Sequence, residues 1–269
     1  MTVSPRTVEL LRDLDRPSGW VLLVDGVEQS YVDVDDPTHL EFEYMQHMAL
    51  VIDAVLPPHV PVHALHLGGG AMAMPRWVAA TRPGSTQVIV ESSPEVVAAV
   101  EPLGPVDGCS LVAGDAMEGA AAVAAGSIDL LVWDLYDGPL AVTSSLTSVS
   151  FALMHQLLAP TGVLVLNVSD VMPFDVVRPV LAALRVELRE VMLVAEPSTL
   201  RGRRSGNCVL VAADMDLPAR GVARRAAAAP VRGRVLHGSG VVEFVAGALP
   251  PTEAQPLPPP DERSGRAFL

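Results

Sequence analysis

The fold is decided by the stretch VHALHLGGGAM, residues 62–72. Its apolar run predicts a buried strand over 62–68, and the residues after the glycines, 72–82, have the apolar spacing of a helix. The glycines at 68–70 predict a tight turn, where the backbone comes close to a ligand and the helix N-terminus offers free N–H groups. This turn is neither the spaced GxGxxG fingerprint of dinucleotide sites nor a phosphate-binding loop with GK[ST]. A tight turn that binds no ligand is the alternative.

Strand and helix signals alternate through the rest of the chain. Apolar runs predict further strands at 86–91, 109–115, 127–134, 162–169, 190–195 and 207–213. Helical segments are predicted at 94–101, 116–125, 145–159 and 174–186. This order predicts an α/β fold with a mostly parallel open sheet that is covered on both faces. The last strand follows without a clear helix, which indicates an antiparallel hairpin at the sheet edge.

Two further segments flank the predicted sheet. Residues 19–34 predict a hairpin around Asp25-Gly26, and residues 38–55 predict a helix. Beyond the last strand, an Arg/Ala-rich run (218–234) and a Pro-rich run (249–260) are typical of an irregular or flexible extension. We therefore predict an N-terminal hairpin-and-helix subdomain (1–56), a Rossmann-like domain (57–215) and a C-terminal extension (216–269).

The composition excludes several classes of protein. The chain has 269 residues with 31 acidic residues against 18 arginines, no lysine, and a net charge of -13. This acidic balance argues against a general nucleic-acid binder. Cys109 and Cys208 are too few for a disulfide framework or a Cys-rich zinc site. The charged residues at 5–16 and the lack of a long apolar run predict no signal peptide and no membrane span, so we expect a cytoplasmic protein.

Carboxylates follow two strands of the predicted sheet. Glu91 ends the strand after the glycine turn, at a spacing from Gly70 that suits acceptance from both ribose hydroxyls of a nucleoside. Asp115 follows the next strand, where it can accept from the exocyclic amine of adenine. Each has an alternative role, Glu91 as an acid at a helix N-terminus and Asp115 as the N-cap of 116–125. With the glycine turn, they favour a nucleoside site.

Asp134 and Asp137 flank an aromatic residue, Tyr136, at the carboxyl end of the fourth strand. Ligands of open α/β sheets bind just beyond these strand ends. An alkyl ammonium has a pKa of about 10, so an amine needs a proton acceptor as it attacks. We predict that Asp134 is this acceptor, with surface loop acids as the alternative.

Other polar residues give weaker signals. The seven histidines show no zinc-ligand spacing, so we expect no metal. His66 alternates with apolar residues on its strand and is predicted to be a core histidine with satisfied hydrogen bonds. His39 and His47 can reach a pocket mouth near Tyr44. The arginines at 201–204 can bind an anionic group, although a solvated loop is the more common case.

These motifs, in this order, resemble those of the spermidine synthase family, the polyamine aminopropyltransferases, over about Val21–Ala212. The nucleoside half is similar to the family's L-D-G-x-x-Q strand, G-G-G turn, ribose acid and adenine-side G-D, here carried by Gln29, Gly68, Gly69, Gly70, Glu91 and Asp115. The acceptor half is similar to a substrate-contacting tyrosine and a D-S-S-D-P loop, here Tyr44, Asp134, Tyr136 and Asp137. The resemblance implies that Asp134 is the catalytic base.

The acceptor half also departs from the family pattern. Ala71 stands where the family has the aspartate that holds the amine of the aminopropyl arm, and Met45 stands where it has glutamine. The serine pair is missing between Asp134 and Asp137. Residues 199–206 replace the family's Tyr-Pro-Ser-Gly stretch.

The resemblance implies a class I S-adenosylmethionine-dependent methyltransferase fold, with an antiparallel last strand and a small N-terminal β-hairpin subdomain. It implies transfer of an aminopropyl group from decarboxylated S-adenosylmethionine to a small-molecule amine such as putrescine, with Asp137 and Tyr44 holding the cationic end. A homodimer is also implied. Methyl transfer from S-adenosylmethionine to another small molecule and nucleoside binding without catalysis are the alternatives.

Overall fold

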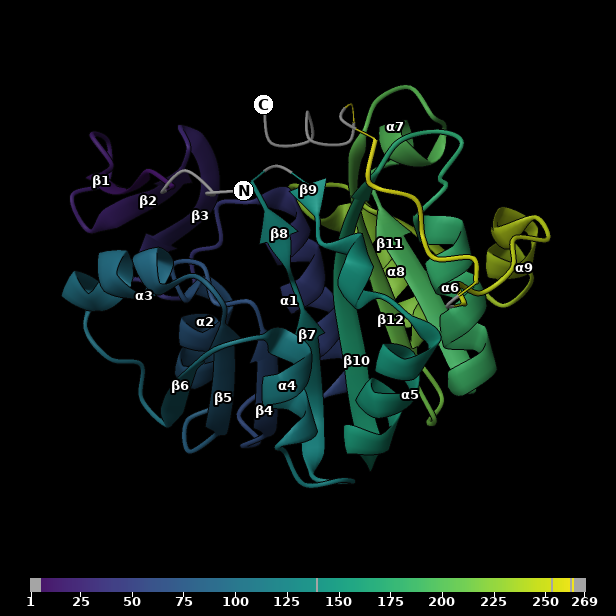
Figure 1. Cartoon of the computed structure of the whole chain (residues 1–269), viewed down its shortest axis with the longest axis horizontal. Coiled ribbons are helices and arrows are strands. Elements are labelled where there is room, and N and C mark those ends of the chain that lie inside the picture. The colour runs from purple at the N-terminus through teal and green to yellow at the C-terminus, as the bar shows by residue number, and fades with distance from the viewer. Residues whose placement is uncertain (1–5, 139, 253, 262, 264–269) are drawn as a thin grey trace.

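An eight-stranded sheet, in the order β13-β11-β12-β10-β7-β4-β5-β6, organises the molecule (Figure 1). The computed structural model describes residues 6–138, 140–252, 254–261 and 263. Six strands point the same way: β4 (His63–Leu67), β5 (Thr86–Glu91), β6 (Cys109–Ala113), β7 (Ile128–Trp133), β10 (Leu158–Asp170) and β11 (Glu190–Ala195). The other two, β12 (Gly206–Ala213) and β13 (Arg234–His237), run in the opposite direction. The predicted α/β fold with a mostly parallel sheet is confirmed.

Helices cover both faces of this sheet. One core is formed under α4 (Ala116–Ala121), α5 (Ser148–Leu157), α6 (Val177–Glu187) and α9 (Ser239–Val245). The opposite core lies under α1 (Glu43–Val55), α2 (Ala73–Thr81) and α8 (Ala219–Ala228). Among the described residues, no helix is both long and apolar enough to cross a bilayer.

A second, three-stranded sheet forms the N-terminal part of the described chain. It consists of β1 (Val8–Arg12), β2 (Gly19–Val24) and β3 (Val27–Asp33), and β2 and β3 are the hairpin that the sequence predicts around Asp25-Gly26. The small sheet packs its apolar side chains against Ile89 of β5 and against α3 (Pro94–Val100). This contact places β2 and β3 beside the glycine turn.

The prediction that the last strand lies at the sheet edge is wrong. β12 inserts between β10 and β11, so it is an inner strand, and the edge is formed by β13. Both faces of β12 are apolar, since Val209 and Val211 enter one core and Cys208 and Leu210 enter the other. An inner position buries both faces, which an edge position does not.

The segment predicted as an irregular extension contributes three elements to the fold. α8 packs on α1 through Val222 and Ala226, β13 pairs with β11, and α9 packs on α6. The arginines of α8 obscure its two buried positions in the sequence, although their spacing of four residues is that of a helix. The domain boundaries at 56 and 215 stay predictions, and residues 1–5 and 264–269 lie outside the described residues.

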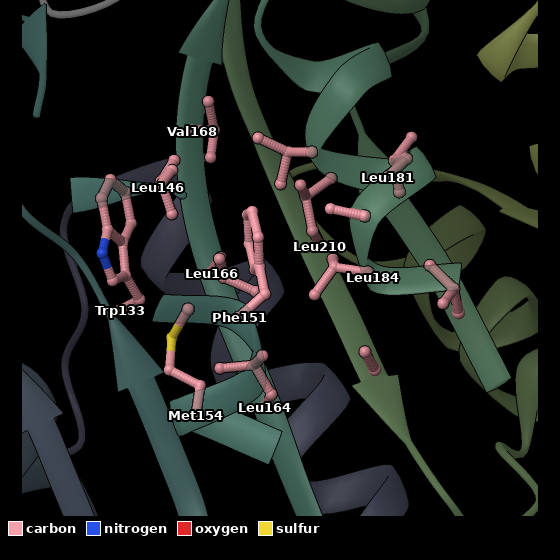
Figure 2. Close-up of a cluster of buried hydrophobic side chains, with 14 of the residues drawn as sticks. Trp133, Leu146, Phe151, Met154, Leu164, Leu166, Val168, Leu181, Leu184 and Leu210 are labelled. Carbon is pink, nitrogen blue, oxygen red and sulfur yellow. The ribbon is translucent and has the colours of Figure 1, made fainter. Parts of the chain in front are cut away.

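One hydrophobic core lies between the helices α5 and α6 and the strands β7, β10 and β12. It supports the strands that carry the site. Figure 2 shows Trp133 of β7, Phe151 of α5 and Leu210 of β12 within one cluster of buried side chains. Phe151 is 1% exposed, whereas Val149 on the same helix is 65% exposed. Substitutions at these two positions therefore distinguish the effect of burial on stability from the effect of helix propensity.

Replacement of Phe151 by alanine should lower the free energy of unfolding by about 3–5 kcal/mol, because it leaves a cavity in this cluster. Val149→Ala, the matched control, should change the same quantity by no more than about 0.5 kcal/mol. Urea denaturation followed by circular dichroism measures both. Equal effects of the two substitutions would contradict the assigned core.

Candidate active site

A cavity of about 350 Å³ lies beyond the carboxyl ends of β4, β5, β6 and β7. Its wall includes nearly all the predicted site residues: Gln29, Tyr44, Gly68, Gly69, Gly70, Glu91, Asp115, Asp134 and Tyr136. β2 and β3 contribute the side chains of Leu22, Val24 and Ser30. Motifs separated by more than 100 residues in the sequence thus line one chamber.

The glycine turn is connected to the strands on both sides of β4. The Gly68 amide donates to the Val90 carbonyl at 2.9 Å, and the Asp134 amide donates to the Leu67 carbonyl at 2.9 Å. Gly68 has a φ of 96°, and a Cβ atom at this position would collide with the carbonyl oxygen of Asp134. Only glycine allows the turn and Asp134 to lie so close together.

Glu91 is fixed against the same turn. One oxygen of its carboxylate accepts from the amides of Gly69 and Gly70 at 3.0 and 3.4 Å, and the other accepts from the amide of Ser93 at 2.9 Å. Three backbone donors hold the carboxylate at the end of β5, in the cavity wall. This is the place where the sequence predicts a ribose-binding acid.

Asp115 has the alternative role that the sequence allows, and it also lines the cavity. Its Oδ1 atom accepts from the amides of Met117 and Glu118 at 2.8 and 3.0 Å, so Asp115 is the N-cap of α4. Both capping bonds use the same oxygen. A ligand can therefore still bind to the carboxylate without breaking the cap.

Asp134 is the most strongly perturbed carboxyl group in the cavity wall. Its Oδ1 accepts from the amide nitrogen of Asn167 at 3.0 Å, and its Oδ2 accepts from the hydroxyl of Tyr44 at 3.1 Å. Burial raises the pKa of Asp134 to about 6, although both donors lower it by favouring the charged form. A carboxyl group with this pKa is mostly ionised near pH 7 and can accept a proton.

Two tyrosines border the acceptor side of Asp134. Burial raises the pKa of both Tyr44 and Tyr136 well above the usual value, so each stays a neutral phenol. The Tyr136 hydroxyl accepts from the Ser169 amide at 2.9 Å and donates to the Asn207 side-chain oxygen at 3.4 Å. Hydrogen bonds thus hold both tyrosines in the cavity wall that contains the carboxylate.

Asp137 does not line the cavity. Its side chain is 65% exposed and forms an ion pair with Arg6, which itself reaches the cavity wall. Asp137 lies in β8 (Tyr136–Asp137), which pairs with β9 (Leu140–Ala141) in a small hairpin. The predicted role of Asp137 in holding an amine stays a prediction, and its side chain lies outside the cavity wall.

Of the weaker candidates, His66 lines this cavity, whereas His39, His47 and Arg204 lie outside it. His39 pairs with Glu41 at 3.0 Å, and His47 lines a separate hollow of about 20 Å³ with Glu43 and Glu196. A hydrogen bond to Glu196 and burial raise the pKa of Glu43 to about 6. Arg204 forms ion pairs with both glutamates, so it is not free to bind an anion. No group of three or more metal-ligating side chains occurs among the described residues.

Two residues of the cavity region, Asn167 and Ser30, are not predicted from the sequence. Asn167, fully buried on β10, orients Asp134, and Ser30 on β3 lies beside Gly70. The signal for Asn167 is its polarity within an otherwise apolar strand that adjoins the strand of Asp134. The sequence gives no comparable signal for Ser30, because it follows Gln29 in a hairpin whose residues are expected to be exposed.

Comparison with known proteins gives matches in structure. No family model and no curated protein sequence matches the chain. A probable spermidine synthase from Corynebacterium glutamicum is 26% identical and has a TM-score of 0.83, with 94% of this chain and 97% of that chain covered. The chain has the fold of the spermidine synthases.

More distant structures share this spermidine synthase fold. A spermidine synthase in complex with the transition state analogue AdoDATO is 15% identical, with a TM-score of 0.54 and coverage of 84% of this chain and 75% of that chain. Human methyltransferase-like protein 13 in complex with SAH is 17% identical, with a TM-score of 0.53 and coverage of 75% and 90%. The predicted Rossmann-like class I methyltransferase fold and the resemblance to the spermidine synthase family are confirmed.

Removal of the Asn167 donor should raise the pKa of Asp134 above its value of about 6, because the charged form loses a hydrogen bond. The change is Asn167→Leu, and the midpoint is measured by carbon-13 NMR of carboxyl-labelled aspartate, with Asp134→Asn identifying the resonance. Ser169→Ala, two positions along β10, keeps the backbone bond to Tyr136 and should leave the midpoint unchanged. An unchanged or lower midpoint in Asn167→Leu would show that Asn167 does not stabilise the charged carboxylate.

Proposed function

We propose that this protein transfers an aminopropyl group from decarboxylated S-adenosylmethionine to a primary amine. The observation that carries the proposal is the position of Asp134. It is a proton acceptor with a pKa of about 6, in the wall of the chamber that also contains the glycine turn, Glu91 and Asp115. The spermidine synthase fold supports the same reaction class.

The nucleoside would bind along the ends of β4, β5 and β6. Glu91 accepts from the two ribose hydroxyls, Asp115 accepts from the adenine amine, and Gln29 lies on the opposite wall, on β3. The neighbours solved in complex with AdoDATO and SAH support an adenosyl ligand. No metal is required for this arrangement.

The reaction needs alignment and one proton transfer. The amine lone pair attacks the methylene next to the sulfonium, so a C–N bond forms while the C–S bond breaks and its electron pair stays on sulfur. Asp134 takes one proton from the acceptor ammonium as the attack proceeds, which frees the nitrogen lone pair, and the leaving group is a neutral thioether. Because no anion develops, no oxyanion hole is needed, and catalysis rests on proximity and on the base.

Tyr44 and Tyr136 define where the amine approaches. Tyr44 donates to Asp134, which orients the carboxylate, and Tyr136 lines the cavity beside it. The amine would meet Asp134 between these two rings. Asp137 has no part in this binding mode, since it is engaged by Arg6.

One observation favours a second candidate, methyl transfer from S-adenosylmethionine. Ala71 is fully buried next to the glycine turn, and it offers no carboxylate for the ammonium of an aminopropyl arm. The same position also offers nothing to repel the amino-acid end of the intact molecule. The relative affinity of the two adenosyl compounds distinguishes these candidates.

The base is tested by Asp134→Asn, which should reduce kcat by about 10²–10⁴-fold while the affinity for the adenosyl compound is kept. In the unchanged protein, the rate should rise tenfold per pH unit below about 6 and level off above it, because the deprotonated carboxylate is the active form. Product formation by mass spectrometry over a panel of amines measures both.

Asp137→Asn is the matched control for the base. It lies three residues away but outside the cavity wall, so kcat should change less than about twofold. Turnover that survives in Asp134→Asn would remove Asp134 as the base. Absence of product with every amine, together with measurable nucleoside binding, would favour a protein that binds without catalysis.

The nucleoside site is tested by Glu91→Gln, which should weaken binding of decarboxylated S-adenosylmethionine about tenfold or more, because it removes a charged acceptor. Isothermal calorimetry measures this affinity and that of the intact compound. Glu95→Gln, on the following helix and outside the cavity wall, is the control and should bind normally. Tighter binding of intact S-adenosylmethionine by the unchanged protein would replace aminopropyl transfer with methyl transfer.

A further inference from the structure

His66 lies in the wall of the main cavity with one ring nitrogen that the fold leaves unused. It is on β4, two residues before Gly68, and is 1% exposed. Its neighbours in the cavity wall include Val132 of β7 and Met74 and Pro75 of α2. Among the described residues, its Nδ1 atom has no hydrogen-bond partner.

The hydrogen bonds around His66 determine which nitrogen carries the proton. Pro75 offers only a carbonyl oxygen, so the Gln87 side chain must turn its NH₂ group toward it, at 3.0 Å. The Gln87 side-chain oxygen then faces His66 Nε2 at 2.8 Å, and Nε2 must be the donor. Burial lowers the pKa of His66 to about 4, so the ring is neutral near pH 7. The single ring proton lies on Nε2, and Nδ1 presents a lone pair.

Ser30 is a second unused polar group in this wall. Its hydroxyl is 2% exposed, and it has no hydrogen-bond partner among the described residues. A Cβ atom on Gly70 would lie 3.2 Å from the Ser30 oxygen, so the hydroxyl is next to the glycine turn. Buried polar groups without partners are destabilising, and their presence in a cavity wall indicates a ligand group that satisfies them.

The chemistry of the two groups selects the ligand. The Nδ1 atom can only accept a hydrogen bond, and the serine hydroxyl can accept one as well. An ammonium has three donors and no acceptor, which fits both. A carboxylate has no donor, so its oxygens would face the Nδ1 lone pair without a hydrogen bond.

We propose that His66 Nδ1 and Ser30 Oγ bind the ammonium of the aminopropyl arm of the donor, in a part of the cavity where Ala71 offers no carboxylate. The assignment rests on the proposed function, because the arm belongs to the proposed donor. It makes His66 a determinant of the affinity for an arm that carries an ammonium. It also replaces the expectation of a core histidine with satisfied hydrogen bonds.

Two unreactive ligands isolate this interaction: the adenosyl thioether that carries an aminopropyl arm, and the same thioether with a plain propyl arm. The unchanged protein should bind the amine form about 10- to 100-fold more tightly, which is the range for a hydrogen bond to a charged group. His66→Gln keeps a polar atom toward Gln87 and removes the acceptor at the Nδ1 position, so this preference should be lost. His66→Asn keeps an acceptor near the Nδ1 position and should retain most of it.

Calorimetry with the plain propyl thioether is the internal control for folding, and its affinity should be the same in all variants. If His66→Gln does not fold, Ser30→Ala decides, with an expected loss of several-fold for the amine form alone. Equal affinities of the unchanged protein for the two thioethers, or equal losses for both in the variants, would overturn the assignment. A preference for the amine form without any product from a panel of amines would support the assignment and refute the proposed transfer.

Discussion

The close approach of Gly68 to the backbone of Asp134 is the constraint on which the site depends. The amides of Gly68 and Asp134 extend the hydrogen bonding between β4 and its neighbours beyond the ends of the strands. The absence of a Cβ atom at Gly68 lets the glycine turn and the carboxyl end of β7 pack directly against each other. This brings Asp134, the proposed base, next to the turn at which we propose that the nucleoside binds. A side chain at position 68 would separate them and open the chamber.

The burial that shapes this chamber also adjusts its acid. Asp134 is surrounded by apolar and aromatic groups, and this burial disfavours its charged form. Hydrogen bonds from Asn167 and Tyr44 stabilise the charged form and so offset part of this effect. The two donors leave the pKa between that of a free aspartate and that of an isolated buried acid. A carboxylate in this intermediate state is ionised near pH 7 and can take a proton from an alkyl ammonium as the nitrogen attacks. The strand order makes this possible, because β10 carries Asn167 beside β7.

The parts of the structure that follow from local sequence could be predicted. The acids at 91, 115 and 134 each lie at or just beyond the carboxyl end of a strand, and parallel strands bring such residues to one edge. Asp137 could not be placed in this way, since its partner, Arg6, is 131 positions distant and no local pattern connects them. β12 was misplaced because the order of strands in a sheet is not contained in the hydropathy of any one strand. α8 was missed because its alanine- and arginine-rich composition is also typical of a flexible extension, and only Val222 and Ala226 are buried.

The limit of local sequence patterns also applies to His66. The position of His66 gives the cavity two chemically different halves. Alternation with apolar residues correctly indicates that the side chain is buried, but only the chain of bonds from Pro75 through Gln87 shows which ring nitrogen is occupied. The rim then presents the carboxylates of Glu91, Asp115 and Asp134, and the wall near the turn presents two neutral acceptors. A ligand with hydroxyls and a sulfonium near the rim and an ammonium at the end of a short arm satisfies every one of these groups. Under the proposed assignment, the protonation state of one buried imidazole therefore determines whether the wall near the turn offers an acceptor to the ammonium of the arm.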